Sequence, residues 1–300
     1  MRSPSRAFFA PAALAVAVAG ACADLAVPAR GDGGGAILAQ EAPGRRSPPR
    51  VEVLIGEPNV ERAYRFPPSD EPLGRHTLYW TRAIYSGSRG RRGWGSASWA
   101  TDFPKGDRQF LVVLKRLVRL DAYDWENAVS LDDPRIRRFP LLYAVEVGYM
   151  DLTPEEIHGL RDYLNAGGML VVDDFWGTRE WAAFERNMRL VLPGREIVDI
   201  PRDHPLFSSF YDITEIKQVP NVGAARRITY FGEGATWERD GYYPFVKGIL
   251  DDHGEIMVLI HWNTDLGDAW EWAEDPMYPL EYSTYAYEMG ANMIVYGMSH

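Results

Sequence analysis

The sequence predicts an α/β fold in three layers, a mainly parallel sheet with helices on both faces. Residues 141–147 and 169–172 are nearly continuous apolar runs, typical of strands buried on both faces of a parallel sheet. Between them lies a well-marked helix, and a second amphipathic segment at 108–120 comes before them. Strands and helices that alternate at this spacing favour right-handed crossovers between parallel strands.

The early elements follow in order along the chain. Residues 77–85 are rich in aromatic and β-branched residues, which favours a strand, and 108–120 carries the apolar stripe of a helix. The helix after the strand at 141–147 begins with Thr153-Pro154-Glu155-Glu156, which combines an N-cap, a proline at the first position and a capping-box glutamate. Gly167-Gly168 ends that helix, and the strand at 169–172 follows.

The later elements are less regular. A helix is expected at 179–192, where Trp181, Phe184, Met188 and Val191 share one face. Beyond it we expect strands at 197–200, 227–231 and 256–261 and a closing helix at 282–298. No internal repeat interrupts this pattern.

Composition excludes several classes of protein. Of the 300 residues, 46% are hydrophobic and 25% charged, as in a soluble globular chain with a sizeable core. The formal charge of −10 gives no electrostatic footprint for nucleic-acid binding. The single cysteine, Cys22, excludes an intrachain disulfide and any cysteine-rich zinc or iron–sulfur site.

Residues 1–22 are predicted to be a signal peptide. Arg2 and Arg6 precede an apolar run at 8–21, which is too short to span a bilayer but fits a secretory signal. Export to the periplasm or cell envelope is therefore expected. Cys22 follows Ala19-Gly20-Ala21, where a lipoprotein signal places its acylated cysteine, although a Leu or Val is more usual three residues before it. Plain cleavage near Ala21, Ala23 or Ala39 is the alternative to lipidation.

The remainder divides into a linker and one domain. Residues 23–50 are rich in Gly, Pro, Ala and Arg without apolar periodicity, which predicts a disordered tether. Residues 51–300 then form a single α/β domain.

Three sequence segments carry a family resemblance. The first is Trp99-Ala-Thr-Asp102-Phe-Pro104. The second combines Pro140-Leu-Leu-Tyr143 with the run from Gly167 through Asp173-Asp174 to Gly177. The third is Asp203-His204-Pro205-Leu206-Phe207, followed by Phe210-Tyr211 and Gln218-Val219-Pro220. Together, over about 77–298, they resemble the bacterial family called domain of unknown function 4159.

The resemblance implies a branch of the class I glutamine amidotransferase-like, flavodoxin-like fold, close to trehalose-utilisation-like proteins. It implies an envelope compartment but no reaction, because the activity of the family is not established. Families of this kind can also sit beside AAA-type ATPase and von Willebrand A-domain proteins, which implies a component of an assembly.

The residue inventory limits the chemistry of this fold. Amidotransferases of the fold use a cysteine nucleophile on a sharp strand-to-helix turn, activated by a histidine. The corresponding turn here carries Asp173-Asp174, and the only cysteine lies in the signal segment. Cys–His glutamine hydrolysis is therefore excluded. No Gly-x-Ser-x-Gly elbow is present either, which argues against a serine hydrolase.

Asp173 and Asp174 are the first candidate site residues, because ligands of open α/β sheets bind outside the carboxyl ends of the strands. Either carboxylate could act as a general base, a metal ligand or an acceptor for sugar hydroxyls. The structural alternative has one of them cap the helix at Thr178-Arg179 and the other pair with an arginine such as Arg82.

The remaining candidates each have a structural alternative. Asp102 could meet a ligand or cap the turn into Pro104. His204 and His261 could supply an acid–base or metal-binding imidazole, or be satisfied core histidines.

Two segments offer weaker signals. The loop at 87–95 has glycines, three arginines and Trp94 that could meet an acidic glycan or lipid headgroup, or form a solvated loop. The acidic segment 263–282 matches a calcium loop poorly, and its tryptophans and tyrosines form either a sugar platform or a core cover.

The favoured hypothesis is an exported domain that binds a small molecule, a glycan or an envelope protein without catalysis; the alternative is a carbohydrate-active hydrolase. The residues assigned to catalysis in the alternative are Asp173, Asp174 and His204, and those assigned to ligand binding are Arg82, Trp99, Asp102, Trp176 and His261. No metal site and no cofactor is expected, no nucleic acid is an expected partner, and membrane contact is expected only through the signal or a lipid on Cys22.

Overall fold

The computed structural model describes residues 76–87 and 98–299. The predicted signal segment 1–22 and linker 23–50 lie outside the described residues, and so does most of the Gly-rich loop at 87–95. Among the described residues, no helix is both long enough and apolar enough to cross a membrane.

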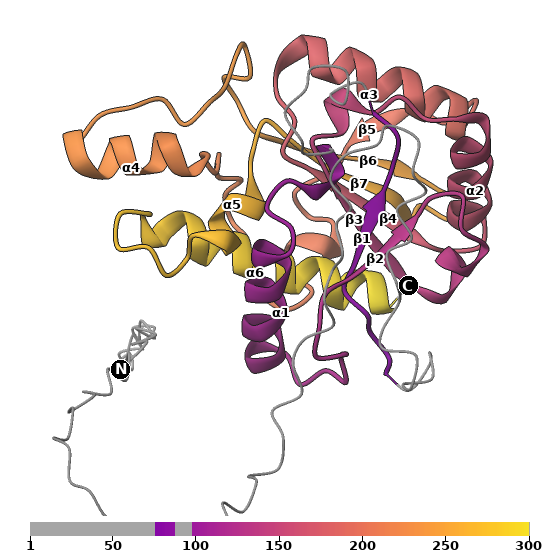
Figure 1. Cartoon of the computed structure of the whole chain (residues 1–300), viewed down its shortest axis with the longest axis horizontal. Helices are drawn as coiled ribbons and strands as arrows, with labels where there is room; N and C mark the ends of the chain where they lie inside the picture. The colour runs from indigo at the N-terminus through magenta and orange to yellow at the C-terminus, as the bar shows by residue number, and fades with distance from the viewer. Residues whose placement is uncertain (1–75, 88–97, 300) are drawn as a thin grey trace, which may run out of the picture. The chain divides into compact units, whose positions relative to one another are not determined.

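A seven-stranded, mainly parallel sheet forms the centre of the fold (Figure 1). Its strand order is β2-β1-β3-β4-β7-β6-β5, in which β2, β1, β3, β4 and β7 run parallel and β6 is antiparallel to both of its neighbours. The strands are β1 (Thr81–Ile84), β2 (Asn127–Ser130), β3 (Leu141–Val145), β4 (Met169–Asp173), β5 (Ile197–Asp199), β6 (Phe245–Leu250) and β7 (Ile256–Trp262).

Helices cover both faces of the sheet, which confirms the predicted layering (Figure 1). The α-helices are α1 (Lys105–Leu117), α2 (Pro154–Asn165), α3 (Gly177–Val191), α4 (Val222–Phe231), α5 (Leu266–Glu271) and α6 (Leu280–Ser299). Leu141, Tyr143 and Val145 of β3 pack in the core with α1, α5 and α6, whereas Leu142 and Ala144 pack in the core with α2 and α3. The continuous apolar runs therefore serve two cores at once, as expected of central strands.

The capping signal at Thr153 is confirmed. The Thr153 side chain accepts a hydrogen bond from Glu156 N, and the Glu156 carboxylate accepts one from Thr153 N. This reciprocal pair satisfies two amide groups that the first turn of α2 would otherwise leave unpaired. The second Glu156 oxygen accepts from Ser86 N, so the same carboxylate also ties α2 to the segment after β1.

One expected strand is wrong: residues 227–231 lie in the second half of helix α4. The β-branched and aromatic run Ile228-Thr229-Tyr230-Phe231 favoured a strand. Asn221, whose side chain accepts from Ala224 N, begins the helix instead, and the left-handed Gly232 ends it. Strands β2 and β6 and the short helix α5 were not predicted.

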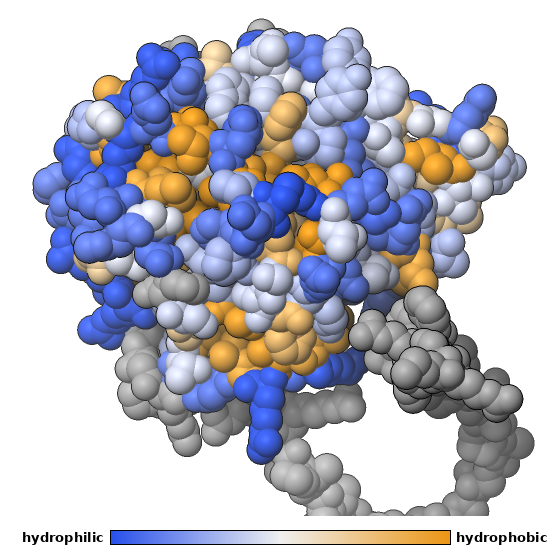
Figure 2. Space-filling view, turned by 180° about the vertical axis from the view of Figure 1, so that it is seen from behind, coloured by the Kyte–Doolittle hydropathy of each residue, from blue (hydrophilic) through white to orange (hydrophobic). Residues whose placement is uncertain are grey.

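Large apolar side chains are exposed on α4 and on the segment that leads from it to β6. Seen from behind, the molecule shows hydrophobic residues in separate patches among hydrophilic ones (Figure 2). The exposed aromatic residues of this part are Tyr230, Phe231, Trp237, Tyr242, Tyr243 and Phe245. The strand prediction failed in this part of the chain, because its aromatic residues do not enter the core.

Candidate functional site

Acidic side chains follow three neighbouring parallel strands at one edge of the sheet. Glu146 comes directly after β3, Asp174 directly after β4, and Asp265 shortly after β7. Parallel strands end at the same edge, so these three residues are brought together there. Asp102, from the loop that precedes α1, completes the group.

Backbone hydrogen bonds beyond the strand ends fix the position of these loops. Glu146 N donates to Asp174 O over 3.0 Å, and Asp174 N donates to Thr264 O over 3.1 Å. Asp265 N donates in turn to Val219 O over 3.1 Å. The segments that carry Glu146, Asp174 and Asp265 are therefore tied to one another through their main chains.

Arg82 of β1 holds the loop that carries Asp102. Its buried guanidinium donates to the carbonyls of Trp99 (3.2 Å) and Thr101 (2.9 Å), and it pairs with Asp107 of α1. Because the Asp107 carboxylate and the two carbonyls surround Arg82, its charge is already matched. Arg82 thus positions the Asp102 loop and does not line the pocket that Asp102 reaches.

The backbone is left-handed at the acidic positions themselves. Asp102, Glu146 and Asp174 have φ angles of 61°, 54° and 50°. Within the described part of the chain, the other two non-glycine residues of this kind are Arg239 and Asn263, and Asn263 lies two residues before Asp265. Residues other than glycine adopt this conformation at a free-energy cost, and such residues cluster at functional sites.

The loops enclose a pocket of about 280 Å³, which we call the acidic pocket. Six carboxylates line it: Asp102, Glu146, Asp174, Glu238, Asp265 and Asp268. Among the described residues that line it, Arg239 is the one basic side chain; it pairs with Glu180 and donates to the Tyr149 hydroxyl. The pocket therefore has a large excess of negative charge.

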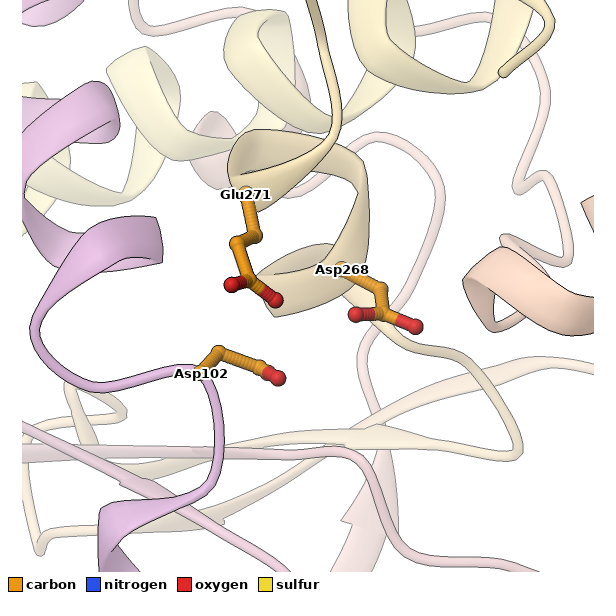
Figure 3. A group of neighbouring side chains, drawn as sticks. All are labelled: Asp102, Asp268 and Glu271. Atoms are coloured by element: carbon orange, nitrogen blue, oxygen red, sulfur yellow. The ribbon is translucent and has the colours of Figure 1, made fainter. Parts of the chain in front are cut away.

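Oxygen atoms of these carboxylates approach one another in two groups. One group joins Asp102, Asp174 and Asp265, and the other joins Asp102, Asp268 and Glu271; within each group one oxygen per residue lies within 4.8 Å of the others. Figure 3 shows the second group, with Glu271 and Asp268 reaching from α5 toward Asp102. Asp102 belongs to both groups, and its Oδ2 atom is fully buried without a hydrogen-bond partner.

Burial raises the pKa of each carboxyl in these two groups, which are Asp102, Asp174, Asp265, Asp268 and Glu271. For Asp174 the neighbouring charges of Glu146, Asp102 and Asp173 raise the pKa further, and for Asp265 the charges of Asp174 and Asp268 do so. The pKa of Asp102 is also raised well above its usual range, chiefly by burial and by Asp268, although Arg82 opposes this. Like charges held together in a buried space favour a bound cation or proton.

Asp173 has a different role from its neighbour. Its Oδ2 accepts hydrogen bonds from the Tyr143 hydroxyl (2.8 Å), Leu266 N (2.8 Å) and Gly267 N (3.2 Å), so it ties β4 to the first turn of α5. Its side chain does not line the acidic pocket. Complete burial nevertheless raises the pKa of this carboxyl to about 7.

Capping of α3 and pairing with Arg82 were the structural roles considered for Asp173 and Asp174, and other residues fill both. Asp240 accepts hydrogen bonds from the amide (3.0 Å) and hydroxyl (2.6 Å) of Thr178, and Asn263 Oδ1 accepts from Gly177 N (2.8 Å). Arg82 pairs with Asp107. Asp174 Oδ1 accepts only from Trp176 Nε1, over 3.0 Å. No capping or ion-pairing role within the described chain accounts for Asp174.

The structure does not bring the two histidines to the pocket. His204 precedes the short helix η5 (Pro205–Phe207), accepts from Leu206 N and packs on the ring of Tyr296 in α6. His261 is buried in β7 with its Nε2 3.1 Å from Met293 Sδ, and burial lowers its pKa to about 3. Neither imidazole is placed to act with Asp174.

The two tryptophans differ in their relation to the pocket. Trp176 lines it and donates to Asp174, as described. Trp99 is buried, packs against Phe103 and contributes its carbonyl to Arg82. Trp99 therefore helps to hold the Asp102 loop through its carbonyl and its contact with Phe103.

The aromatic residues of the segment 263–282 mostly pack inside the protein. Trp270 is fully buried and stacks on Phe110 with ring centroids 4.2 Å apart. Tyr278 is buried and donates its hydroxyl to Pro220 O. These two residues therefore cover the core, which is the structural alternative, and neither has an exposed face that a sugar could contact.

Sequence reasoning missed several residues of the pocket. Asp265 follows the strand predicted at 256–261, so the strand-end rule that found Asp174 could also have found it, although it was noted only as part of the acidic segment. Glu146 lies inside the run predicted as a strand at 141–147, so that rule did not apply to it. Glu238 and Arg239 lie in an irregular segment after α4, where no periodicity or motif signals a position near the sheet edge. Asp268 and Glu271 were noted only as part of an acidic segment.

A larger hollow of about 410 Å³ lies near the start of β7 and is lined by Asp251, Asp252 and His253 among others. Asp252 and His253 are exposed, and Asp251 Oδ1 accepts from the amides of His253 and Glu255. A turn thus accounts for Asp251. We place the candidate site in the smaller, acidic pocket because Asp174, Asp265 and Asp268 are buried there and the fully buried Oδ2 of Asp102 has no hydrogen-bond partner.

Comparison with known proteins adds a family but no reaction. A family model described as "Domain of unknown function (DUF4159)" matches residues 89–298, which is more than two thirds of the chain and includes the acidic pocket. No curated protein matches the chain.

Proposed function

The chain belongs to the family described as domain of unknown function (DUF4159), and we propose that it is an exported ligand-binding domain whose ligand binds in the acidic pocket. The observation that carries this proposal is the buried Oδ2 of Asp102, which lies at the pocket without a hydrogen-bond partner. An unpaired buried acceptor costs about 1–3 kcal/mol, and a ligand that donates to it removes that penalty.

The surroundings of Asp174 support a branch of the amidotransferase-like fold without amidotransferase activity. Asp174 has left-handed φ on the sharp turn between β4 and α3, the kind of turn on which a nucleophile is carried. A carboxylate stands there, and the only cysteine is Cys22 in the N-terminal apolar segment. The position is thus suited to contact a ligand and lacks the thiol that glutamine hydrolysis requires.

A carbohydrate hydrolase built from Asp173, Asp174 and His204 receives less support. Asp173 Oδ2 already accepts three hydrogen bonds, and His204 packs on Tyr296. The carboxylates that do meet suit binding of hydroxyl or cationic groups, since ionised carboxylates are acceptors only. We therefore propose a glycan or another polyhydroxylated or cationic small molecule as the ligand.

A thermal-shift screen followed by calorimetry tests this assignment. We expect at least one compound from a panel of neutral sugars, amino sugars and polyamines to raise the melting temperature, and Asp174→Asn to abolish that shift. Asp203→Asn, a substitution of the same type at an exposed position, is the matched control and should leave the shift intact. A ligand that binds both variants equally would show that the acidic pocket is not its site.

Export and lipidation are tested separately from ligand binding. We expect the full-length chain, produced in a bacterial host, to be found in the envelope fraction. If Cys22 is acylated, labelled palmitate will be incorporated into the chain and the Cys22→Ser variant will lose the label. Export without label would indicate plain signal cleavage, and retention of the chain in the cytoplasm would contradict the proposed location.

A further inference from the structure

We propose that Asp102, Asp174 and Asp265 bind one hard divalent cation of the size of Ca²⁺. Each residue offers a carboxylate oxygen, and the three oxygens lie within 4.8 Å of one another. The inference shares the acidic pocket with the proposed function, but it does not depend on which organic ligand binds there.

The spacing of the oxygens suits such an ion. Ca²⁺ binds oxygen at about 2.3–2.6 Å, so ligands on opposite sides of the ion are about 4.6–5.2 Å apart. Three oxygens within 4.8 Å of one another all lie within about 2.8 Å of a point between them, so at most small side-chain shifts bring them to Ca²⁺. Mg²⁺, with oxygen distances of about 2.0–2.1 Å, requires opposite ligands to come within about 4.2 Å.

Burial and the lack of ion pairs distinguish this group from an ordinary acidic surface; Asp174 Oδ1 accepts from Trp176 Nε1, and Asp265 Oδ1 accepts from Asp268 N over 2.7 Å. Asp174 and Asp265 are 7% and 3% exposed. Asp102 Oδ2 is a buried acceptor with no donor, and it lines the same pocket. None of the three carboxylates has an ion pair with a described residue.

The nearby basic side chains already have partners. Arg82 pairs with Asp107, Arg239 pairs with Glu180, and Lys105 lies 3.8 Å from Glu271. Among the described residues, these contacts leave the three aspartates without an ion pair of their own. Removing such charges from water without a counter-charge is costly, and a divalent cation supplies that charge at one point.

The second group of carboxylates fits a cation less well. Asp268 Oδ2 already accepts from Val222 N over 2.6 Å, and Glu271 is near Lys105 and only partly buried. The position of Asp268 beside Asp102 suits a supporting role, in which Asp268 holds α4 and α5 close to the bound ion. We therefore assign the ion to Asp102, Asp174 and Asp265.

The donor set indicates the class of ion. All three donors are carboxylate oxygens, which suit Ca²⁺, Mg²⁺ and Mn²⁺ better than zinc or copper ions. The only described histidine near this edge of the sheet, His261, is occupied with Met293 in the core. Water molecules or a hydroxyl-bearing ligand would complete the coordination on the open side of the pocket.

Calorimetry on the metal-stripped protein gives the main test. After treatment with EDTA and gel filtration, the protein should bind one Ca²⁺ per chain, and 1 mM Ca²⁺ should raise the melting temperature by roughly 5–10 °C if that concentration is 100 times the Kd. Asp174→Asn and Asp265→Asn should each weaken binding at least tenfold, and Asp203→Asn should not. Failure to bind Ca²⁺, Mg²⁺ or Mn²⁺ at millimolar concentration, or full binding by both site variants, would overturn the proposal.

Terbium luminescence gives a second test that needs no site variant to fold. Tb³⁺ replaces Ca²⁺ at oxygen sites and emits when an excited tryptophan is close. Trp176 Nε1 lies 3.0 Å from Asp174 Oδ1, so excitation of the wild-type protein should yield terbium emission that excess Ca²⁺ displaces. Emission that Ca²⁺ does not displace would contradict the site.

The ligand panel separates this inference from the proposed function when it is run both in EDTA and in 1 mM Ca²⁺. A sugar or polyamine that binds in EDTA, with no ion bound under any condition, supports the proposed function and refutes the cation site. An ion that binds, with no organic ligand in either condition, supports the cation site and refutes the proposed function.

Discussion

The Arg82→Met variant is expected to lose about 3–5 kcal/mol of unfolding free energy, because it leaves the buried charge of Asp107 without its counter-charge and with Trp80 Nε1 as its remaining side-chain donor. Arg82 and Asp107 are each 1% exposed or less, and Arg82 also donates to the carbonyls of Trp99 and Thr101. Methionine has a similar apolar stem but cannot replace any of these hydrogen bonds. Urea denaturation of the described domain, monitored by circular dichroism, measures the loss.

Two further variants show whether burial causes this effect. Arg135→Met removes an arginine whose pair with Asp133 lies at the surface, with 47% of the arginine side chain exposed, and should cost no more than about 1 kcal/mol. Arg82→Met combined with Asp107→Leu removes both buried charges and should recover part of the stability. Equal losses in Arg82→Met and Arg135→Met would contradict the structural role of Arg82.

Arg82 also links the core to the acidic pocket, so its substitution should affect ligand binding as well as stability. Arg82 holds the loop on which Asp102 sits, although it does not itself line the pocket. Loss of these bonds should loosen Asp102 and weaken cation binding even under conditions in which the variant remains folded. Arg82 is therefore a positioning residue for the site.

The predictable part of the fold consists of elements whose local signals and buried environment agree. At α2 the Thr153 cap, the apolar stripe and the glycine stop all indicate the same helix, and the structure confirms its bounds within a residue or two. At α4 the local signals disagree with one another. Residues 228–231 have strand propensity, but they lie at the exposed end of a helix that Asn221 begins. Propensity is a weak guide where the side chains are not packed.

The predictable part of the site is limited to residues at strand ends. Asp174 could be found because a buried strand stops abruptly at an acidic pair. Asp102 could be singled out but not placed, since its approach to the pocket depends on Arg82 and on the packing of α1. Asp173 shows the limit of the strand-end rule. Adjacent residues on a strand point in opposite directions, so the sequence of the Asp173-Asp174 pair does not tell which of the two faces the core.

The buried carboxyl of Asp173 should make the metal-free protein less stable as the pH rises. Burial raises the pKa of this group to about 7, so the folded protein binds its proton more tightly than the unfolded chain does, in which the pKa is about 3.9. The stabilisation is fully present below about pH 4 and is lost as the pH rises to about 7, by up to about 1.4 kcal/mol per pH unit. Over this interval the loss from Asp173 amounts to about 4 kcal/mol.

Asp173→Asn should remove that pH dependence. Asparagine keeps an oxygen to accept from Tyr143, Leu266 and Gly267, and its amino group takes the place of Oδ1, which has no hydrogen-bond partner. At pH 4 the variant should be less stable than the wild type by about 1–3 kcal/mol, because its amino group has two buried, unpaired donors where the protonated carboxyl has one. By pH 8 the difference should have shifted by about 4 kcal/mol in favour of the variant.

Urea unfolding in EDTA at pH 4, 6 and 8 measures this shift. A stability difference that does not change with pH, or an equal shift in the exposed control Asp203→Asn, would show that Asp173 is not the titrating group, because only a carboxyl that is protonated in the fold and ionised in the unfolded chain produces it.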